Sequence, residues 1–226
     1  MSGSKRIAVM ESVYKRNEDA AGEFNKLLTA KKIFCVNVIG SPGAGKTTLL
    51  IKIIQNLGRS ACVIEGDIES SIDTARLIEH GIVATQLNTG GACHLDAPSV
   101  RRAFEGAWPS YVDGFLFVEN VGNLVCPAEF LIGEHARMLV CSVTDGSDKP
   151  YKYPLAFERA DAVLVNKIDL LKYVEFDENF FTDGVRRLNG RAPIFFVSGT
   201  AGDGTAGDGA DAVAEWMRET AVKYIV

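Results

Sequence analysis

Residues 40–47 read Gly-Ser-Pro-Gly-Ala-Gly-Lys-Thr, and the interpretation of the whole chain starts from this stretch. It matches the pattern G-x-x-x-x-G-K-[S/T], in which backbone N–H groups surround a polyphosphate. An apolar, partly β-branched run precedes it at 33–39, and an apolar helical pattern follows at 48–57 and ends at Gly58. Strand, glycine loop and helix start favour a phosphate-binding loop over a plain glycine turn. We therefore predict a nucleotide-binding protein.

The residues of this loop have separate expected roles. Lys46 should reach the terminal phosphates and take part in catalysis, and the Thr47 hydroxyl should bind Mg²⁺. Contacts to the nucleotide are expected from Gly43, Ala44, Gly45, Lys46, Thr47 and Thr48.

The composition limits the class of protein. The 226 residues fit a single α/β domain, and 24 Lys and Arg against 29 Asp and Glu give a net charge of −5. This balance does not suggest a nucleic-acid or anionic-membrane partner. No apolar run approaches the roughly 20 residues of a bilayer span, and the start has no secretory pattern. We expect a cytoplasmic protein.

Short, continuous apolar runs recur after the first strand. They lie at 61–64, 82–84, 115–118, 138–141, 162–165 and 194–197. Such runs fit strands that helices bury on both faces, and the helical patterns between them predict parallel crossovers. The predicted fold is α/β, a P-loop NTPase with a doubly wound, mostly parallel sheet of about seven strands. We expect a helical segment over 1–31 and the nucleotide-binding domain over 32–226.

Acidic residues follow two of the predicted strands. Asp67 and then Asp73 follow the run at 61–64, and Glu119 follows the run at 115–118, three residues before Gly122. Ligands sit at the carboxyl ends of parallel strands, so these carboxylates can hold Mg²⁺ or orient the attacking water. The alternative is a helix cap with a solvated face. Catalytic roles are assigned to Asp73 and Glu119.

A second nucleotide motif follows the strand at 162–165. Asn166, Lys167 and Asp169 form the pattern N-K-x-D, and the Asp169 carboxylate suits the N–H donors of guanine. We therefore expect GTP and GDP as the nucleotides. Ser198 and Gly199 resemble the loop that closes over the base, although no lysine follows. The glycine- and aspartate-rich residues 201–209 are interpreted as a flexible loop rather than a calcium repeat.

The five cysteines divide into two groups. Cys35, Cys62 and Cys141 lie inside predicted strands and are assigned to the core. The remaining two, Cys93 next to His94 and Cys126 beyond Gly122, are predicted in loops, where thiolate and imidazole suit Zn²⁺, Ni²⁺ or copper. Three ligands would leave a tetrahedral site one short, and a symmetry mate could complete it. An incidental Cys-His pair and a Cys-His nucleophile remain alternatives.

These segments resemble the HypB family of hydrogenase nickel-incorporation GTPases, a nickel-chaperone branch of the SIMIBI class. The matching stretches are 40–50, 65–76, 88–97, 119–130, 148–154 and 166–170. The urease counterpart, UreG, shares the fold but carries Cys-Pro-His and a different switch sequence, which makes it the second candidate. The N-terminal metal-binding motifs of some family members are absent here.

The resemblance implies a GTP-dependent homodimer that carries Ni²⁺ or Zn²⁺ on Cys93, His94 and Cys126. It implies delivery of nickel to the large-subunit precursor of [NiFe] hydrogenase with a HypA-type zinc protein as partner. It also places Thr47, Asp73 and Glu119 around Mg²⁺ and the γ-phosphate. A different class of function, a GTP-regulated scaffold with purely structural zinc, would keep its metal against a chelator in both nucleotide states.

The residue after Gly122 bears on the rate of hydrolysis. Ras-like GTPases place a water-orienting Gln there, whereas this chain has Asn123. We therefore expect slow intrinsic GTP hydrolysis, of about 10⁻⁴ to 10⁻² s⁻¹ without a helper.

Overall fold

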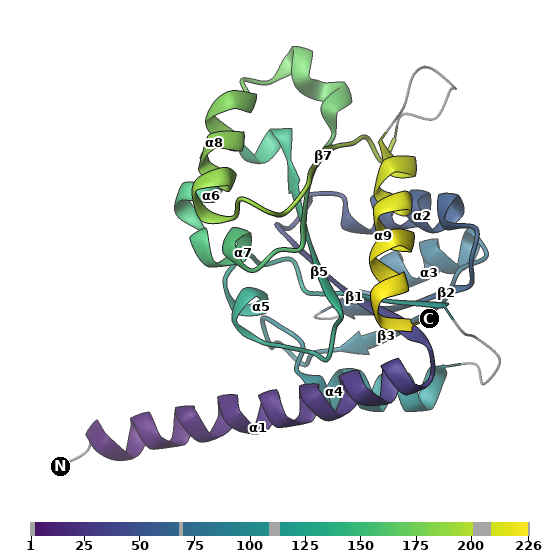
Figure 1. Ribbon diagram of the computed structural model, residues 1–226, viewed down its shortest axis with the longest axis vertical. Helices are drawn as coiled ribbons and strands as arrows, with labels where there is room; N and C mark the ends of the chain where they lie inside the picture. The colour runs from purple at the N-terminus through teal and green to yellow at the C-terminus, as the bar shows by residue number, and fades with distance from the viewer. Residues whose placement is uncertain (1–2, 68–69, 109–113, 201–208, 226) are drawn as a thin grey trace.

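A computed structural model of the chain describes residues 3–67, 70–108, 114–200 and 209–225, with side chains from residue 13 onward. In these ranges the centre of the molecule is a seven-stranded sheet in the order β3-β2-β4-β1-β5-β6-β7 (Figure 1). Every strand pair is parallel, which confirms the predicted doubly wound architecture. The strands are β1 (Ile33–Gly40), β2 (Ala61–Asp67), β3 (Val83–Asn88), β4 (Gly114–Glu119), β5 (Ala136–Ser142), β6 (Ala162–Asn166) and β7 (Ile194–Phe196).

Side chains of β1 alternate between the two faces of the sheet. Phe34, Val36 and Val38 pack with α2 (Lys46–Leu57) and α9 (Ala210–Ile225). Ile33 and Cys35 face the other way, toward α1 (Gly3–Ala30) and α4 (Ala97–Ala107). Each large side chain buried in this way contributes about 1.5–3 kcal/mol, so helices on both faces are what hold the sheet.

The remaining helices are short and lie mostly beside β5 and β6. They are α3 (Ile72–Glu79), α5 (Cys126–Glu129), α6 (Lys149–Lys152), α7 (Pro154–Glu158), α8 (Glu178–Leu188) and the 3₁₀ turns η1 (Val143–Asp145) and η2 (Ile168–Tyr173). Phe157 of α7 and Phe181 of α8 are fully buried against Leu139 and Val163. Together with the packing on the two faces of β1, this makes a third apolar cluster, which supports the part of the sheet that carries the N-K-x-D motif.

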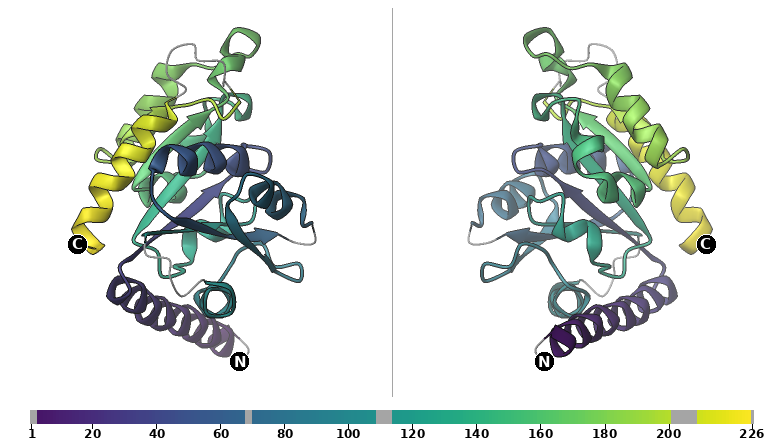
Figure 2. Two further views of the ribbon diagram at one scale, coloured as in Figure 1. Left: turned by 90° about the vertical axis from the view of Figure 1, so that its right-hand side faces the viewer. Right: turned by 90° about the vertical axis from the view of Figure 1, so that its left-hand side faces the viewer.

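The long helix α1 runs along one end of the molecule beside α4 (Figures 1 and 2). Phe24 and Leu28 on its inner face are fully buried. Asn17 donates to the Leu131 carbonyl at 2.8 Å and accepts from the Ala97 N–H at 3.0 Å. The helix α1 thus covers residues 3–30 of the segment expected to be helical, and the two hydrogen bonds of Asn17 fasten it to two neighbouring segments.

The predicted strands β2 and β3 are longer than their apolar runs. Polar residues at their carboxyl ends remain in the parallel ladder, where Glu65 of β2 stands in register with Glu119 of β4. Cys35, Cys62 and Cys141 are buried, as predicted. The prediction for 201–209 falls almost wholly outside the described residues. Among the described helices, none combines the length and apolar character that crossing a bilayer requires.

Candidate nucleotide and metal site

The phosphate-binding loop joins β1 to α2 at the carboxyl edge of the sheet. Gly45 has a φ of +85°, and a Cβ there would lie 2.6 Å from Asn166 Nδ2, so only glycine fits. Asn166 donates to the Ala44 carbonyl at 2.9 Å, and Lys167 donates from Nζ to the Gly43 carbonyl at 2.6 Å. Two side chains of the N-K-x-D motif thus hold the backbone of the phosphate-binding loop in place by hydrogen bonds. Thr48, the last predicted contact, accepts from the Arg76 guanidinium at 2.9 Å.

A cluster of charged side chains lies at the start of α2. Lys46 and Thr47 are buried, and the Thr47 hydroxyl donates to Glu119 Oε1 at 2.9 Å. Burial raises the pKa of Glu119 to about 7, although Lys46 and the Thr47 hydrogen bond act to lower it. Burial also raises the pKa of Glu65 to about 7. Asp73 at the start of α3 adds repulsion to both glutamates, which brings three predicted catalytic residues, Lys46, Asp73 and Glu119, into one electrostatic group.

The residues at this cluster fit a magnesium ion. Glu119 Oε2 is buried and, among the described residues, has no hydrogen-bond partner. A buried carboxylate oxygen without a donor, next to a threonine hydroxyl, is the oxygen donor set that Mg²⁺ prefers. Thr47 and Glu119 would hold the ion, and Asp73 would balance its charge; the ion would neutralise the phosphates of a bound nucleotide.

Asp67 has a different set of contacts. Its Oδ2 accepts from the Ser70 N–H at 2.8 Å, and its charge raises the pKa of the neighbouring Glu65. The side chain therefore holds the backbone N–H of Ser70, two residues before α3 begins. Its predicted role as a magnesium ligand stays a prediction.

The residues predicted to contact the base lie together at the ends of β6 and β7. Asn166 is buried and accepts from the Gly199 N–H at 3.0 Å, which ties the two loops together. Asp169 is exposed, and Ser198 donates to its Oδ1 at 2.5 Å. The second oxygen of this carboxylate can then accept from the donor edge of a guanine base.

The three predicted metal ligands converge. The Cys93 and Cys126 sulfurs lie 2.9 Å apart, Cys93 Sγ lies 3.7 Å from His94 Nδ1, and all the ligand atoms lie within 4.8 Å of one another. In a tetrahedral site with bonds of about 2.3 Å, two thiolates stand about 3.8 Å apart. An opening of about 1 Å between the sulfurs would therefore admit a metal ion.

The protonation states in this group bear on metal binding. Burial lowers the pKa of His94, which favours the neutral imidazole that binds a metal. A hydrogen bond with Cys126 raises the pKa of Cys93, so the apo site holds thiol protons that a metal ion must displace.

A stack of aromatic rings supports His94, and two arginines support the short helix that begins at Cys126. The His94 ring stacks on Phe130 at 3.9 Å between centroids, and Phe130 stacks on Tyr14 of α1 at 4.9 Å. Arg137 and Arg159 both donate to the Ala128 carbonyl, at 2.9 and 3.1 Å, near the end of the helix that begins at Cys126.

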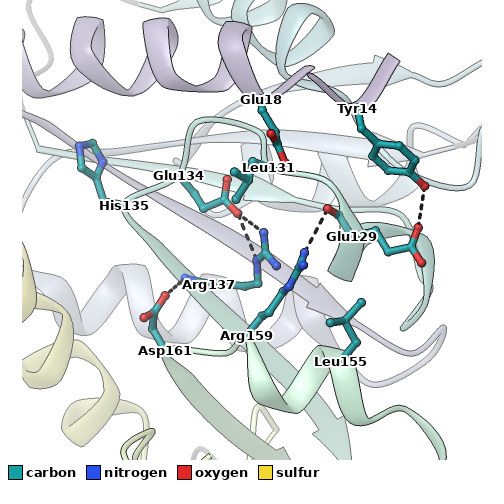
Figure 3. A pocket seen from close by; sticks show the side chains of 10 residues that line it. All are labelled: Tyr14, Glu18, Glu129, Leu131, Glu134, His135, Arg137, Leu155, Arg159 and Asp161. Atoms are coloured by element: carbon teal, nitrogen blue, oxygen red, sulfur yellow. Dashed lines mark hydrogen bonds and ion pairs between the residues drawn. The ribbon is translucent and has the colours of Figure 1, made fainter. Parts of the chain in front are cut away.

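These arginines line a cavity of 680 Å³ near the amino ends of β5 and β6 (Figure 3). Tyr14 donates to Glu129 at 3.0 Å at its rim, and Arg137 is ion-paired with Glu134 inside it. The guanidinium groups of Arg137 and Arg159 are thus already engaged in bonds that fix α5 and the loop after it.

Three residues that are not among the predicted ligands and catalytic groups belong to the site. Glu65 could have been found from its place at the carboxyl end of β2. Asn120 and Asn123 bond through their side chains to the loop that carries Cys93. These contacts are tertiary, and no local sequence signal, including the place of Asn123 after Gly122, predicts them.

Comparison with known proteins agrees with this geometry. Residues 34–196 match the family model described as CobW/HypB/UreG, nucleotide-binding domain. The hydrogenase maturation factor HypB of Azotobacter chroococcum is 44% identical over 96% of this chain and 69% of its own length. The hydrogenase/urease maturation factor HypB of Helicobacter pylori is 36% identical over 86% of this chain and 81% of its own.

A solved structure has the same arrangement of elements. The crystal structure of HypB from Helicobacter pylori in complex with nickel superposes with a TM-score of 0.85, at 33% identity over 93% of this chain and 98% of that one. The chain therefore belongs to the CobW/HypB/UreG family of nucleotide-binding proteins, in its branch of HypB hydrogenase maturation factors.

Proposed function

We propose that this chain binds and hydrolyses GTP and carries nickel for insertion into [NiFe] hydrogenase. The observation that carries the proposal is the convergence of Cys93, His94 and Cys126. Cys126 lies seven residues beyond Glu119, which contacts the phosphate-binding loop through Thr47. Names of the relatives support it, because they are hydrogenase maturation factors and one was crystallised with nickel.

GTP would be held at two ends. Backbone N–H groups of residues 43–48 and the Lys46 ammonium would bind its phosphates at the start of α2. Asp169 would accept from the guanine edge, and Ser198, which already donates to one oxygen of Asp169, would keep that carboxylate in place. Adenine offers a different donor pattern and would leave the carboxylate without its donors.

Hydrolysis would depend on charge neutralisation more than on a base. Lys46 and a magnesium ion on Thr47 and Glu119 would stabilise the charge that builds on the phosphoryl oxygens, with Asp73 close to both. Asn123 is the residue that follows Gly122, and its amide is bonded to protein groups on both sides. We expect slow intrinsic turnover for this reason.

Nickel is the cargo of this proposal. Two cysteine thiolates and one neutral imidazole suit Ni²⁺ and Zn²⁺ and leave a position for transfer. Val125 beside Cys126 is 51% exposed, which suits a contact with a second copy of the chain. A GTP-dependent homodimer would complete the site, a HypA-type protein would exchange metal with it, and the hydrogenase large-subunit precursor would receive the nickel.

The histidines offer a matched test of the metal assignment. His94→Ala removes a ligand, whereas His80→Ala changes an exposed histidine at the end of α3 whose backbone N–H bonds to the Leu77 and Ile78 carbonyls. We expect His94→Ala to weaken Ni²⁺ binding by more than about 100-fold, because even outer partners of ligands are worth about 10–100-fold. His80→Ala should bind as the parent does. Equal Ni²⁺ affinities in the two variants would contradict the assignment.

Two other functions are alternatives that experiment can separate from this one. The Helicobacter pylori relative is named for both hydrogenase and urease maturation, so a urease role is a second candidate for the recipient. A scaffold with structural zinc would hold its metal against a chelator with GDP and with a GTP analogue alike, and metal loss would unfold the loop that carries Cys93.

A further inference from the structure

The segment that follows Glu119 is hydrogen-bonded to the end of β1 and contacts the phosphate-binding loop. The Asn120 N–H donates to the Val38 carbonyl at 2.9 Å, and the Asn123 N–H donates to the Gly40 carbonyl at 3.0 Å. Between them, a Cβ on Gly122 would lie 3.0 Å from Pro42 Cα, so this segment touches the loop closely. A shift of the phosphate-binding loop must therefore displace the backbone of Asn123.

Both halves of the Asn123 side-chain amide are bonded to the metal-binding segments. Nδ2 donates to the Cys93 carbonyl at 3.3 Å, and Oδ1 accepts from the Val125 N–H at 2.8 Å. Val125 is the residue directly before Cys126. One planar amide thus spans the backbone of the two cysteines, whose sulfurs lie 2.9 Å apart.

Asn120 holds the other side of His94. Its Oδ1 accepts from the Leu95 N–H at 3.2 Å, and its Nδ2 donates to Asn37 of β1 at 3.2 Å. Asn120 is almost completely buried and Asn37 is fully buried, so this end is fixed to the sheet. The backbone around His94 is therefore held at Leu95 by the sheet and at Cys93 by Asn123.

We propose that Asn123 is a positioning residue that sets the separation of Cys93 and Cys126 according to the nucleotide state. The proposal rests on the GTP-dependent nickel carrier proposed above, adds that the nucleotide state changes metal affinity, and assigns this coupling to one side chain. A metal needs the sulfurs about 1 Å further apart than they stand here. The 3.3 Å bond to Cys93 is the long one of the pair, so a small movement of the 119–123 segment changes it first.

The same contacts separate this role from hydrolysis. A residue that orients the attacking water needs a free donor or acceptor that faces the γ-phosphate. The recorded bonds of the Asn123 amide run to the Cys93 and Val125 backbones instead. These two bonds direct both halves of the amide at the segments that carry the cysteines, so we assign Asn123 to the metal site.

The test compares Asn123→Ala with Asn179→Ala, which changes an exposed asparagine in the first turn of α8. The quantity measured is the ratio of the Ni²⁺ dissociation constants with GDP and with a non-hydrolysable GTP analogue. Thiolate-to-nickel charge-transfer absorption in each state serves as an independent readout. We expect the ratio to move toward one by about fivefold or more in Asn123→Ala, and the two absorption spectra to become alike. Asn179→Ala should keep the parent ratio.

Asn123→Asp guards against a folding defect. Its shape matches asparagine and it still accepts from the Val125 N–H, but it can no longer donate to the Cys93 carbonyl. The proposal predicts loss of the ratio here too. A parent-like ratio in either Asn123 variant would overturn the proposal, whatever happens to GTP turnover. A parent protein whose own ratio is one would instead overturn the nucleotide-gated function.

Discussion

Glu119→Gln should make the nucleotide-free protein more stable at high pH while it impairs the nucleotide site. The pKa of Glu119 is raised from 4.5 to about 7 by burial, and this value already includes the attraction of Lys46. The folded state therefore binds a proton between pH 4.5 and 7 that the unfolded state has released. Unfolding free energy must fall as pH rises through this window and level off above it.

The size of the effect follows from the same pKa. At about 1.4 kcal/mol per pKa unit, the change from 4.5 to about 7 corresponds to about 3 kcal/mol. Glutamine has the shape of the protonated acid and can still accept from the Thr47 hydroxyl, so the variant lacks this pH-dependent loss. At pH 8 it should exceed the parent by up to about 3 kcal/mol, or about 6–12 °C in Tm, and at pH 5 the difference should shrink to about 1 kcal/mol.

Urea and thermal unfolding between pH 5 and 8.5, with chelator and without nucleotide, measure the difference. Glu79→Gln, on an exposed carboxylate of α3, is the matched control and should follow the parent at every pH. Parallel curves for the parent and Glu119→Gln would refute the burial argument. Because Mg²⁺ requires the ionised carboxylate, Mg²⁺-dependent GDP binding by the parent should also weaken as pH falls below about 7.

Three further substitutions have defined outcomes. Gly45→Ala should abolish GTP binding in calorimetry and cost about 1–3 kcal/mol in urea unfolding, because the new Cβ meets Asn166 at 2.6 Å and φ is +85°; unchanged GTP affinity would contradict this. Phe130→Leu should weaken Ni²⁺ binding about 2- to 10-fold in competition titrations, since the His94 ring loses its stacking partner; an unchanged affinity would remove that role. Asp169→Asn should weaken GTP binding by about 10- to 100-fold and relax the preference over ATP, and an intact preference would refute the guanine assignment.

The elements were predictable because their signals are local. Continuous apolar runs marked all seven strands, and the glycines and N-K-x-D located the loops at their carboxyl ends. The position of β4 between β1 and β2 could not be predicted from any single apolar run. Every strand of a parallel sheet that is buried on both faces has the same apolar pattern. Register across β4 is what places Glu65 next to Glu119.

The metal group shows where local reasoning ends. Cys93, His94 and Cys126 could be proposed from their chemistry, and the structure brings them together. Their supports could not be proposed, because Asn123 and Phe130 act through contacts with segments about 30 or more residues away. An asparagine or a phenylalanine has many ordinary uses, so only the folded structure identifies these two.

The central claim is that the nucleotide state controls metal binding. The most direct measurement is the affinity and stoichiometry of Ni²⁺ and Zn²⁺ with GDP and with a non-hydrolysable GTP analogue, together with the light-scattering mass. We predict that metal affinity or metals per dimer differ between the two states, and that the GTP analogue favours the dimer. Equal and very tight zinc binding in both states, resistant to chelator, would contradict the account and leave a GTP-binding protein with a structural metal.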